Sequence, residues 1–101
     1  MTLNNRAKLY YTKLGAYIGK TENWNAFARK RHDLFNVFDF VVILNNKIIG
    51  LQVTSFSNMS TRVKKIQESK EAEAWKKAGG VIVVQGWKKI KNKFESREVV
   101  I

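Results

Sequence analysis

The sequence predicts a small α/β domain whose central sheet contains strands of mixed direction. A chain of 101 residues with 45% hydrophobic residues is long enough for one packed core and too short for a second. Apolar residues recur at helical spacing near the N-terminus and again after the middle of the chain, whereas β-branched runs lie between and after these segments. The expected order is therefore helix, two or three strands, helix, strand and strand.

In the first half of the chain, apolar residues at helical spacing predict a helix that starts at Asn5 and ends near Gly15 to Gly19. Residues 21–36 have no clear period, which is consistent with an irregular segment or an edge strand. The run Val37–Leu44 is rich in β-branched and aromatic residues and predicts a buried strand. The pair Asn45-Asn46 favours a tight turn, after which Lys47–Phe56 forms an antiparallel partner strand.

In the second half, a helix carries Val63 and Ile66 on one face, and a further helical piece follows from Lys70 to Ala78 until Gly79-Gly80 stops it. The run Val81–Val84 predicts another buried strand. The basic stretch Trp87–Lys93 then leads to an expected edge strand at Arg97–Ile101.

The chain is strongly basic, with 19 Lys and Arg against 8 Asp and Glu and a formal net charge of +11. Such an excess makes nucleic acid the first expected partner and an anionic membrane the second. The sequence contains no cysteine, which excludes disulfide scaffolds, thiolate zinc sites and cysteine nucleophiles. It contains a single histidine, His32. No apolar stretch approaches the roughly 18 residues of a membrane span, and the polar start does not resemble a secretion signal, so we expect a soluble cytoplasmic protein.

Asp39 lies within an apolar run, where an unpaired carboxylate would cost several kcal/mol as an order of magnitude. Asp39 and Gln52 are equally distant from the Asn45-Asn46 turn and should be cross-strand neighbours. Together with the Val53 carbonyl they could form an oxygen-rich notch for Mg²⁺. The alternative is a hydrogen bond between Asp39 and Gln52 that only closes a polar gap in the sheet.

These residues also carry a family resemblance. The segments are Asp33–Asp39 (DLFNVFD), Gly50–Ser55 (GLQVTS), Asn58, Arg62, Lys65-Ile66, Trp75, Gly79-Gly80 and Gly86–Lys88. They resemble small nuclease-like proteins of phage and bacterial genomes, which are similar in turn to the PD-(D/E)XK superfamily of restriction endonucleases and Holliday-junction resolvases. The match runs from about Glu22 to Trp87.

The resemblance implies an αβββαβ restriction-endonuclease-like core with a mixed sheet, and hydrolysis of phosphodiesters with Mg²⁺ or Mn²⁺. Asp39 matches the metal-binding aspartate, Gln52 the acidic position of the next strand and Thr54 the position of a lysine. Glu22 matches an additional acid near the first helix. Two of these matches depart from the pattern, because Gln52 is a neutral ligand and Thr54 cannot supply a cation to the transition state.

Other residues could compensate for these departures. Lys64 or Lys65 could replace the missing cation, and Asp33 could restore a carboxylate. Neighbouring helical positions differ by about 100°, so both lysines cannot face one site, and we favour Lys65 because it immediately precedes Ile66. The alternative for either lysine is a solvated helix face.

Basic residues in three groups are expected to bind nucleic-acid phosphates. They are Arg29, Lys30 and Arg31; Arg62, Lys64 and Lys65, with Asn58 beside them; and Lys88, Lys89, Lys91 and Lys93. Trp24 and Trp87 could stack on unpaired bases, whereas Trp75, at helical spacing, is expected in the core. His32 is expected to be structural or on the surface.

The leading hypothesis is a Mg²⁺- or Mn²⁺-dependent endonuclease that cleaves duplex or branched DNA. A homodimer is expected, because one such domain carries one site and cleavage of two strands needs two. The rival hypothesis is a non-catalytic nucleic-acid-binding module on the same scaffold, which the Gln52 and Thr54 departures favour. A basic protein-interaction factor also fits the size and charge, but no motif supports it.

Overall fold

The computed structural model describes residues 2–21, 23–25, 30–32, 34–35 and 37–101, and of 23–25 and 30–32 it describes the backbone. Within these residues the elements are α1 (Leu3–Lys13), β1 (Tyr17–Lys20), β2 (Asn23–Asn25), β3 (Lys30–His32), β4 (Phe40–Leu44), β5 (Lys47–Ser55), the 3-10 turn η1 (Phe56–Asn58), α2 (Met59–Gln67), α3 (Lys70–Lys77), β6 (Val81–Ile90) and β7 (Lys93–Val100).

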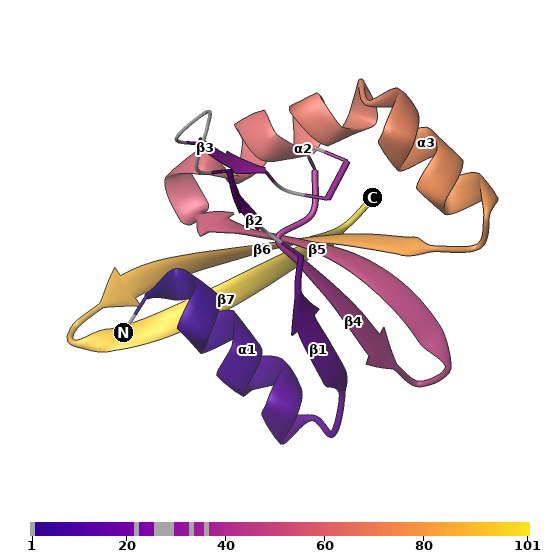
Figure 1. Cartoon of the computed structure of the whole chain (residues 1–101). Helices are drawn as coiled ribbons and strands as arrows, with labels where there is room; N and C mark the ends of the chain where they lie inside the picture. The colour runs from indigo at the N-terminus through magenta and orange to yellow at the C-terminus, as the bar shows by residue number, and fades with distance from the viewer. Residues whose placement is uncertain (1, 22, 26–29, 33, 36) are drawn as a thin grey trace.

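The main sheet has the strand order β1-β4-β5-β6-β7 (Figure 1). Strands β5 and β6 are parallel, and the other neighbouring pairs are antiparallel. The predicted α/β class with a mixed sheet is therefore confirmed. The segment that was expected to be irregular or an edge strand contributes a separate two-stranded sheet, β2-β3.

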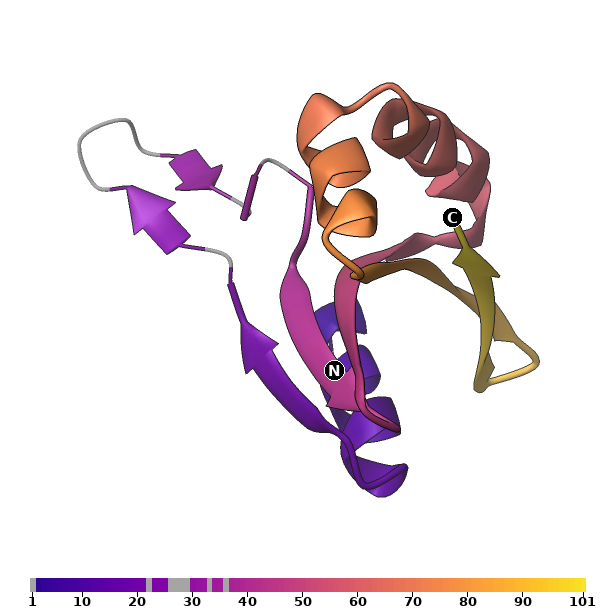
Figure 2. The same cartoon turned by 90° about the vertical axis from the view of Figure 1, so that its right-hand side faces the viewer.

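Helices cover both faces of the sheet (Figure 2). On one face Ala7 and Tyr11 of α1 pack in a core with Leu51 and Val53 of β5. On the other face, the residues of α2 and α3 form a second core with β6; its buried members are Val37, Phe38, Met59, Ile66, Ala72, Ile82 and Val84. Because side chains alternate along a strand, Gln52 and Thr54 of β5 face α2.

The first helix ends just before the predicted range of Gly15 to Gly19. It ends at Lys13, because Gly15 has a φ of +81° and the Ala16 and Gly15 N–H groups close the helix on the carbonyls of Tyr11 and Thr12. Apolar spacing continues beyond this stop, but the chain forms β1, which pairs with β4.

The two hairpin turns of the main sheet are alike. Asn45 and Asn46 have φ values of 54° and 62°, and Lys91 and Asn92 have φ values of 47° and 65°. Two successive left-handed residues form the turn that matches the twist of paired strands. The turn predicted at Asn45-Asn46 is confirmed. The predicted edge strand at the end of the chain is confirmed by β7, but the predicted bounds were wrong: β6 continues to Ile90 instead of stopping near Val84, and β7 starts at Lys93 instead of Arg97.

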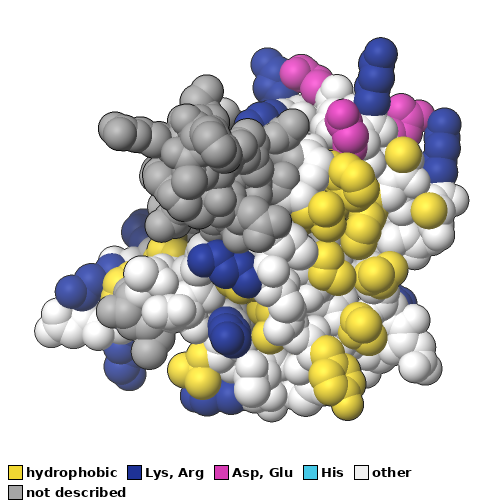
Figure 3. Space-filling view, in the orientation of Figure 1, with side chains coloured by type: hydrophobic (Ala, Val, Ile, Leu, Met, Phe, Trp, Pro, Cys, Tyr) yellow, Lys and Arg dark blue, Asp and Glu magenta, His cyan; other side chains and the backbone are white. Residues whose placement is uncertain are grey.

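The strand predicted from Val37 begins at Phe40, because Phe38 turns into the core. A Cβ placed on Gly50 would lie 2.5 Å from the Phe38 ring, so the ring needs a glycine beneath it. At the open side of the sheet, Tyr17, Ile43 and Ile48 pair across β1, β4 and β5 and are 79%, 50% and 44% exposed. Figure 3 shows hydrophobic side chains gathered on this part of the surface.

Candidate functional site

Asp39 lies immediately before β4 and is held against β5. Its N–H donates to the Leu51 carbonyl (2.8 Å), while its Oδ2 accepts hydrogen bonds from Gln52 Nε2 (3.1 Å) and the Val53 N–H (2.9 Å). Asp39 and Gln52 are 7% and 5% exposed. Thr21 secures the same turn, because its N–H donates to the Asp39 carbonyl at 3.0 Å. The predicted cross-strand contact between Asp39 and Gln52 is confirmed.

The contacts resemble the hydrogen-bonded alternative more than a notch of oxygens. Gln52 presents its NH₂ group to the carboxylate, and Val53 meets it through the N–H and not through the carbonyl assigned as a ligand. Across the described residues, no group of three or more His, Asp or Glu side chains could hold a metal ion. Glu22 and Asp33, the two further acids of the prediction, lie outside those residues.

The donor set still fits a Mg²⁺ or Mn²⁺ ion in its chemistry. Mg²⁺ is bound by one or two carboxylates and keeps several waters, so Asp39 with the Gln52 amide oxygen is a sufficient minimal set. Gln52 contacts the carboxylate through its NH₂ group, so the amide would have to turn its oxygen toward Asp39 for both groups to bind one ion. A neutral amide in place of a second carboxylate makes the expected affinity weak.

Thr54 lies two residues after Gln52 on the same side of β5 and is 6% exposed. It pairs in register with Gly86 of β6. A hydroxyl at this buried position carries no charge. The cation that the family resemblance implies would therefore have to come from another element.

Gln52 shares a cavity with two cations of α2 and with two carboxylates, Glu68 and Glu71. A cavity of about 340 Å³ is lined by Gln52 together with Arg62 and Lys65 of α2, and by Phe35 and Val37. Arg62 and Lys65 are three residues apart and share one side of the helix. Lys64 does not line this cavity. The preference for Lys65 over Lys64 therefore agrees with the direction in which α2 presents its side chains.

Asn58 is the N-cap of α2 and is exposed, and its side chain makes no capping hydrogen bond. A second cavity, of about 430 Å³, lies where the pairing of β5 with β6 ends and is lined by Ser55, Phe56, Ser57, Trp87 and Lys88. These polar and basic groups lie at the same end of the sheet as Gln52 and Thr54. This second cavity shares no lining residue with the cavity beside Gln52.

The predicted phosphate-binding residues fall into separate places. Lys88, Lys89, Lys91 and Lys93 are exposed on the β6–β7 hairpin. Lys30, Arg31 and His32 form β3, of which the backbone is described, and Arg29 lies outside the described residues. The structure thus describes two of the three predicted basic groups with their side chains.

The tryptophans with described side chains are engaged within the protein. Trp75 packs against Phe38 with ring centroids 4.8 Å apart and donates to the Val81 carbonyl (2.9 Å), which confirms its predicted core position. Trp87 donates to Gln85 Oε1 (3.0 Å) and is half-buried. Trp24 belongs to β2, and its side chain is not among those described.

Sequence reasoning missed a polar cluster on the α1 face. Gln85 is fully buried and donates to Glu98 Oε2 (3.2 Å), which also accepts a hydrogen bond from the Tyr11 hydroxyl. Burial, and then the bond to Glu98, raise the pKa of Tyr11 above its ordinary value of 10. The one available signal was Gln85 directly after four apolar residues. The cluster lies on the opposite face from Asp39 and joins α1 to β6 and β7.

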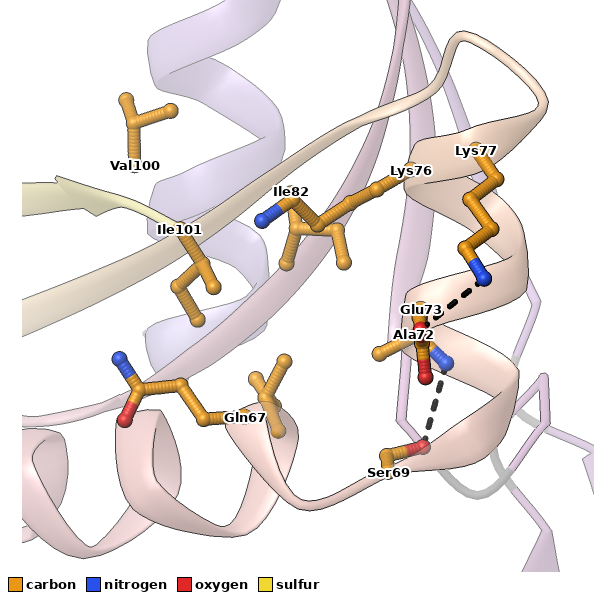
Figure 4. Close-up of a pocket in the computed structure, with 10 residues that line it drawn as sticks. Gln67, Ser69, Ala72, Glu73, Lys76, Lys77, Ile82, Val100 and Ile101 are labelled. Carbon is orange, nitrogen blue, oxygen red and sulfur yellow. Dashed lines mark hydrogen bonds and ion pairs between the residues drawn. The ribbon is translucent and has the colours of Figure 1, made fainter.

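A further cavity, of about 570 Å³, lies between α3, the start of β6 and the end of the chain (Figure 4). Lys77 is paired there with Glu73 at 3.1 Å, and Ser69 Oγ accepts from the Ala72 N–H at 3.2 Å. None of the residues predicted for the active site lines this cavity. It adjoins the cavity beside Gln52, since Ile66 and Ser69 line both.

Comparisons with models of protein families, with curated proteins and with solved structures find no match to this chain. The site is therefore interpreted from its own residues. None of the helices within the described part of the chain is long and apolar enough to cross a membrane.

Proposed function

We propose that the protein is a metal-dependent DNA endonuclease of the PD-(D/E)XK type. The observation that carries the proposal is the buried Asp39 carboxylate in contact with Gln52, which shares a cavity with Arg62 and Lys65. The order of elements also supports it. Helix α1, the antiparallel strands β1, β4 and β5, the pair α2–α3 and the parallel strand β6 occur in the chain order that the αβββαβ resemblance implies, with the separate pair β2-β3 inserted between β1 and β4.

Each residue has a separate task in this proposal. Asp39 and Gln52 would hold a divalent cation, which would supply Lewis-acid polarisation of the phosphoryl group and a more acidic water. Lys65 binds the non-bridging oxygens as negative charge develops on them. Arg62 holds the adjoining phosphate, and its guanidinium can do so with two parallel hydrogen bonds. Thr54 fills the sheet beneath the site without a charge.

A second candidate function, a nucleic-acid-binding module without catalysis, is favoured by one observation. Gln52 donates to Asp39, so the carboxylate is stabilised within the sheet without an ion. A protein of this kind binds DNA through its basic residues alone. Both functions predict binding that weakens steeply with salt, since affinity falls with each phosphate neutralised.

The substitution Asp39→Asn separates the two functions. It removes a metal ligand and a negative charge but keeps the size of the side chain, so we expect a folded protein that binds DNA as tightly as the wild type or more tightly. The proposal expects cleavage of duplex or branched DNA by the wild type with Mg²⁺ or Mn²⁺ and no cleavage by the variant. Equal cleavage by both proteins would refute the assignment of Asp39. If the wild type cleaves neither duplex, branched nor single-stranded DNA with either metal, the endonuclease is refuted and the binding module without catalysis replaces it.

The proposal includes a homodimer, because two strands are cut and each domain carries one site. Light scattering of the protein with and without a branched DNA measures this directly. A protein that remains monomeric in both conditions while it cuts both strands would contradict the homodimer.

A further inference from the structure

Strands β6 and β7 extend beyond the sheet as a two-stranded ribbon. Pairing of β5 with β6 ends at Ser55 and Trp87, whereas pairing of β6 with β7 continues to Ile90 and Lys93. Residues 88–95 therefore form a projection with a free end, which is on the left in Figure 1 and on the right in Figure 2.

The ribbon carries cations on both of its faces. Lys88 and Lys93 are on the α2 face, in line with Gly86, which lies under Met59 of α2. Lys89 is on the α1 face and Lys91 is in the turn. All four lysines are exposed. Figure 3 shows Lys and Arg side chains along this projection.

Several contacts hold the ribbon in one conformation. Its turn consists of two left-handed residues, Lys91 and Asn92, which fixes the geometry of the hairpin. At its base the Arg6 guanidinium lies 3.5 Å from the centre of the Phe94 ring. Such an arm loses little conformational entropy when it binds a partner.

The dimensions and side chains of the ribbon favour a double helix over a single strand. The major groove of B-DNA is about 12 Å wide and admits a two-stranded ribbon, with phosphates along both walls. Single strands are bound by stacking on open aromatic rings. The Phe94 ring is covered by Arg6, and Trp87 is half-buried beside Gln85. The ribbon therefore offers charge on both faces without an open ring.

We propose that the β6–β7 ribbon is an arm that enters the major groove of double-stranded DNA, where Lys91 and Lys93 bind phosphates of the two groove walls. This rests on the proposed function in taking DNA as the partner, and it adds that the substrate must contain a duplex next to the site. Thr54 and Gly86 are paired neighbours, so the base of the arm begins beside the candidate site.

The test compares two double variants with equal charge changes. Lys91→Gln/Lys93→Gln removes two charges from the arm. Lys13→Gln/Lys47→Gln removes two exposed charges at the C-terminal end of α1 and the start of β5, away from the arm (Figure 1). Both are made in Asp39→Asn protein, so that binding is measured without cleavage. The probes are a 20-base-pair DNA duplex, one of its strands and the RNA duplex of the same sequence, in fluorescence anisotropy titrations at several salt concentrations.

The expected loss follows from counterion release. Each phosphate contact contributes a slope of about 0.9 in log K against log[salt], so it is worth about eightfold at 0.1 M salt relative to 1 M. The arm variant should bind the DNA duplex about sixtyfold more weakly at 0.1 M salt, with a slope smaller by about 2. The control variant should lose a few-fold at most. Bulky groups on pyrimidine C5, which project into the major groove, should weaken binding, and a minor-groove ligand should not.

Three results would overturn the proposed arm. They are equal losses of affinity in both variants, a single strand bound as tightly as the duplex, and an RNA duplex bound as tightly as the DNA duplex. The last result counts because the major groove of an RNA duplex is too narrow for protein. These outcomes leave cleavage by the wild type untouched. Conversely, a wild type that does not cleave but loses duplex affinity with the arm lysines would refute the endonuclease and retain the arm.

Discussion

Gln52→Glu tests whether the residues next to Asp39 can hold a cation. The substitution replaces the NH₂ group that lies 3.1 Å from Asp39 Oδ2 with a second carboxylate oxygen, at a position that is 5% exposed. Two unit charges at this distance repel by about 5 kcal/mol at an effective dielectric constant of about 20. Without a metal, the variant has to relieve this repulsion.

Uptake of one proton relieves the repulsion at a lower cost in free energy than keeping both carboxylates charged. Protonating a glutamic acid with an ordinary pKa of about 4.3 costs about 4 kcal/mol at pH 7 and about 1 kcal/mol at pH 5. Because this is less than the repulsion at pH 7, the folded Gln52→Glu protein keeps a proton that the unfolded chain releases. Its free energy of unfolding therefore falls as the pH rises from 5 to 7, by about 1.4 kcal/mol per unit. A divalent cation between the carboxylates restores about 2.7 kcal/mol at a hundred times its Kd.

The assay is urea unfolding followed by circular dichroism, at pH 5 and pH 7, in EDTA and in Mg²⁺ or Mn²⁺. Gln67→Glu is the matched control, since it introduces the same charge at an exposed position of α2 and should cost less than about 1 kcal/mol. At pH 5 the Gln52→Glu variant should be nearly as stable as the wild type, which secures a folded reference. A variant no less stable than the control at pH 7 would show that residues 39 and 52 do not face each other. A loss that neither metal reverses would remove the metal site from the proposal.

Three further predictions concern cleavage, alkaline stability and packing. Lys65→Ala should lower the cleavage rate by about 10²-fold, which is the scale of losing one group that stabilises a transition state. Lys64→Ala on the same helix should leave the rate unchanged, and equal effects of the two substitutions would exclude a catalytic cation from α2. Because the pKa of Tyr11 is raised in the folded protein, the unfolded chain loses the Tyr11 hydroxyl proton at a lower pH than the folded protein does. The free energy of unfolding should therefore fall by up to about 1.4 kcal/mol per pH unit above pH 10. Urea titrations at alkaline pH should show a smaller fall for Tyr11→Phe. Gly50→Ala should destabilise the protein by about 1–3 kcal/mol in thermal unfolding, because the added methyl group overlaps a buried ring, whereas Gly19→Ala has open space and should cost nothing; equal losses would contradict this packing.

Much of the candidate site could be predicted because it depends on local chemistry. The two-residue turn at Asn45-Asn46 sets the register of β4 and β5, and this register alone brings Asp39 to Gln52. Likewise, the apolar face of α2 dictates which side of the helix is turned inward, so the choice of Lys65 followed from helical geometry.

Other features depended on contacts between residues far apart in the sequence. Tyr17–Lys20 continues the helical spacing of α1 but forms a strand, because the Gly15 stop frees it to pair with β4. Similarly, the basic residues after Trp87 have no strand pattern of their own, and they are ordered by pairing with β7.

The hydrogen-bond donors around the Asp39 carboxylate were predicted only in part from the sequence. Residue types placed Asp39 beside Gln52, but only the packed sheet determines that Gln52 turns its NH₂ group, and Val53 its N–H, toward the charge. The Gln85, Glu98 and Tyr11 cluster joins three elements and leaves almost no trace in the sequence. Local rules determine turns, register and helix faces because these depend on neighbours in the chain. The hydrogen bonds of buried polar groups depend on every element that excludes water from them, and these elements meet only in the folded protein.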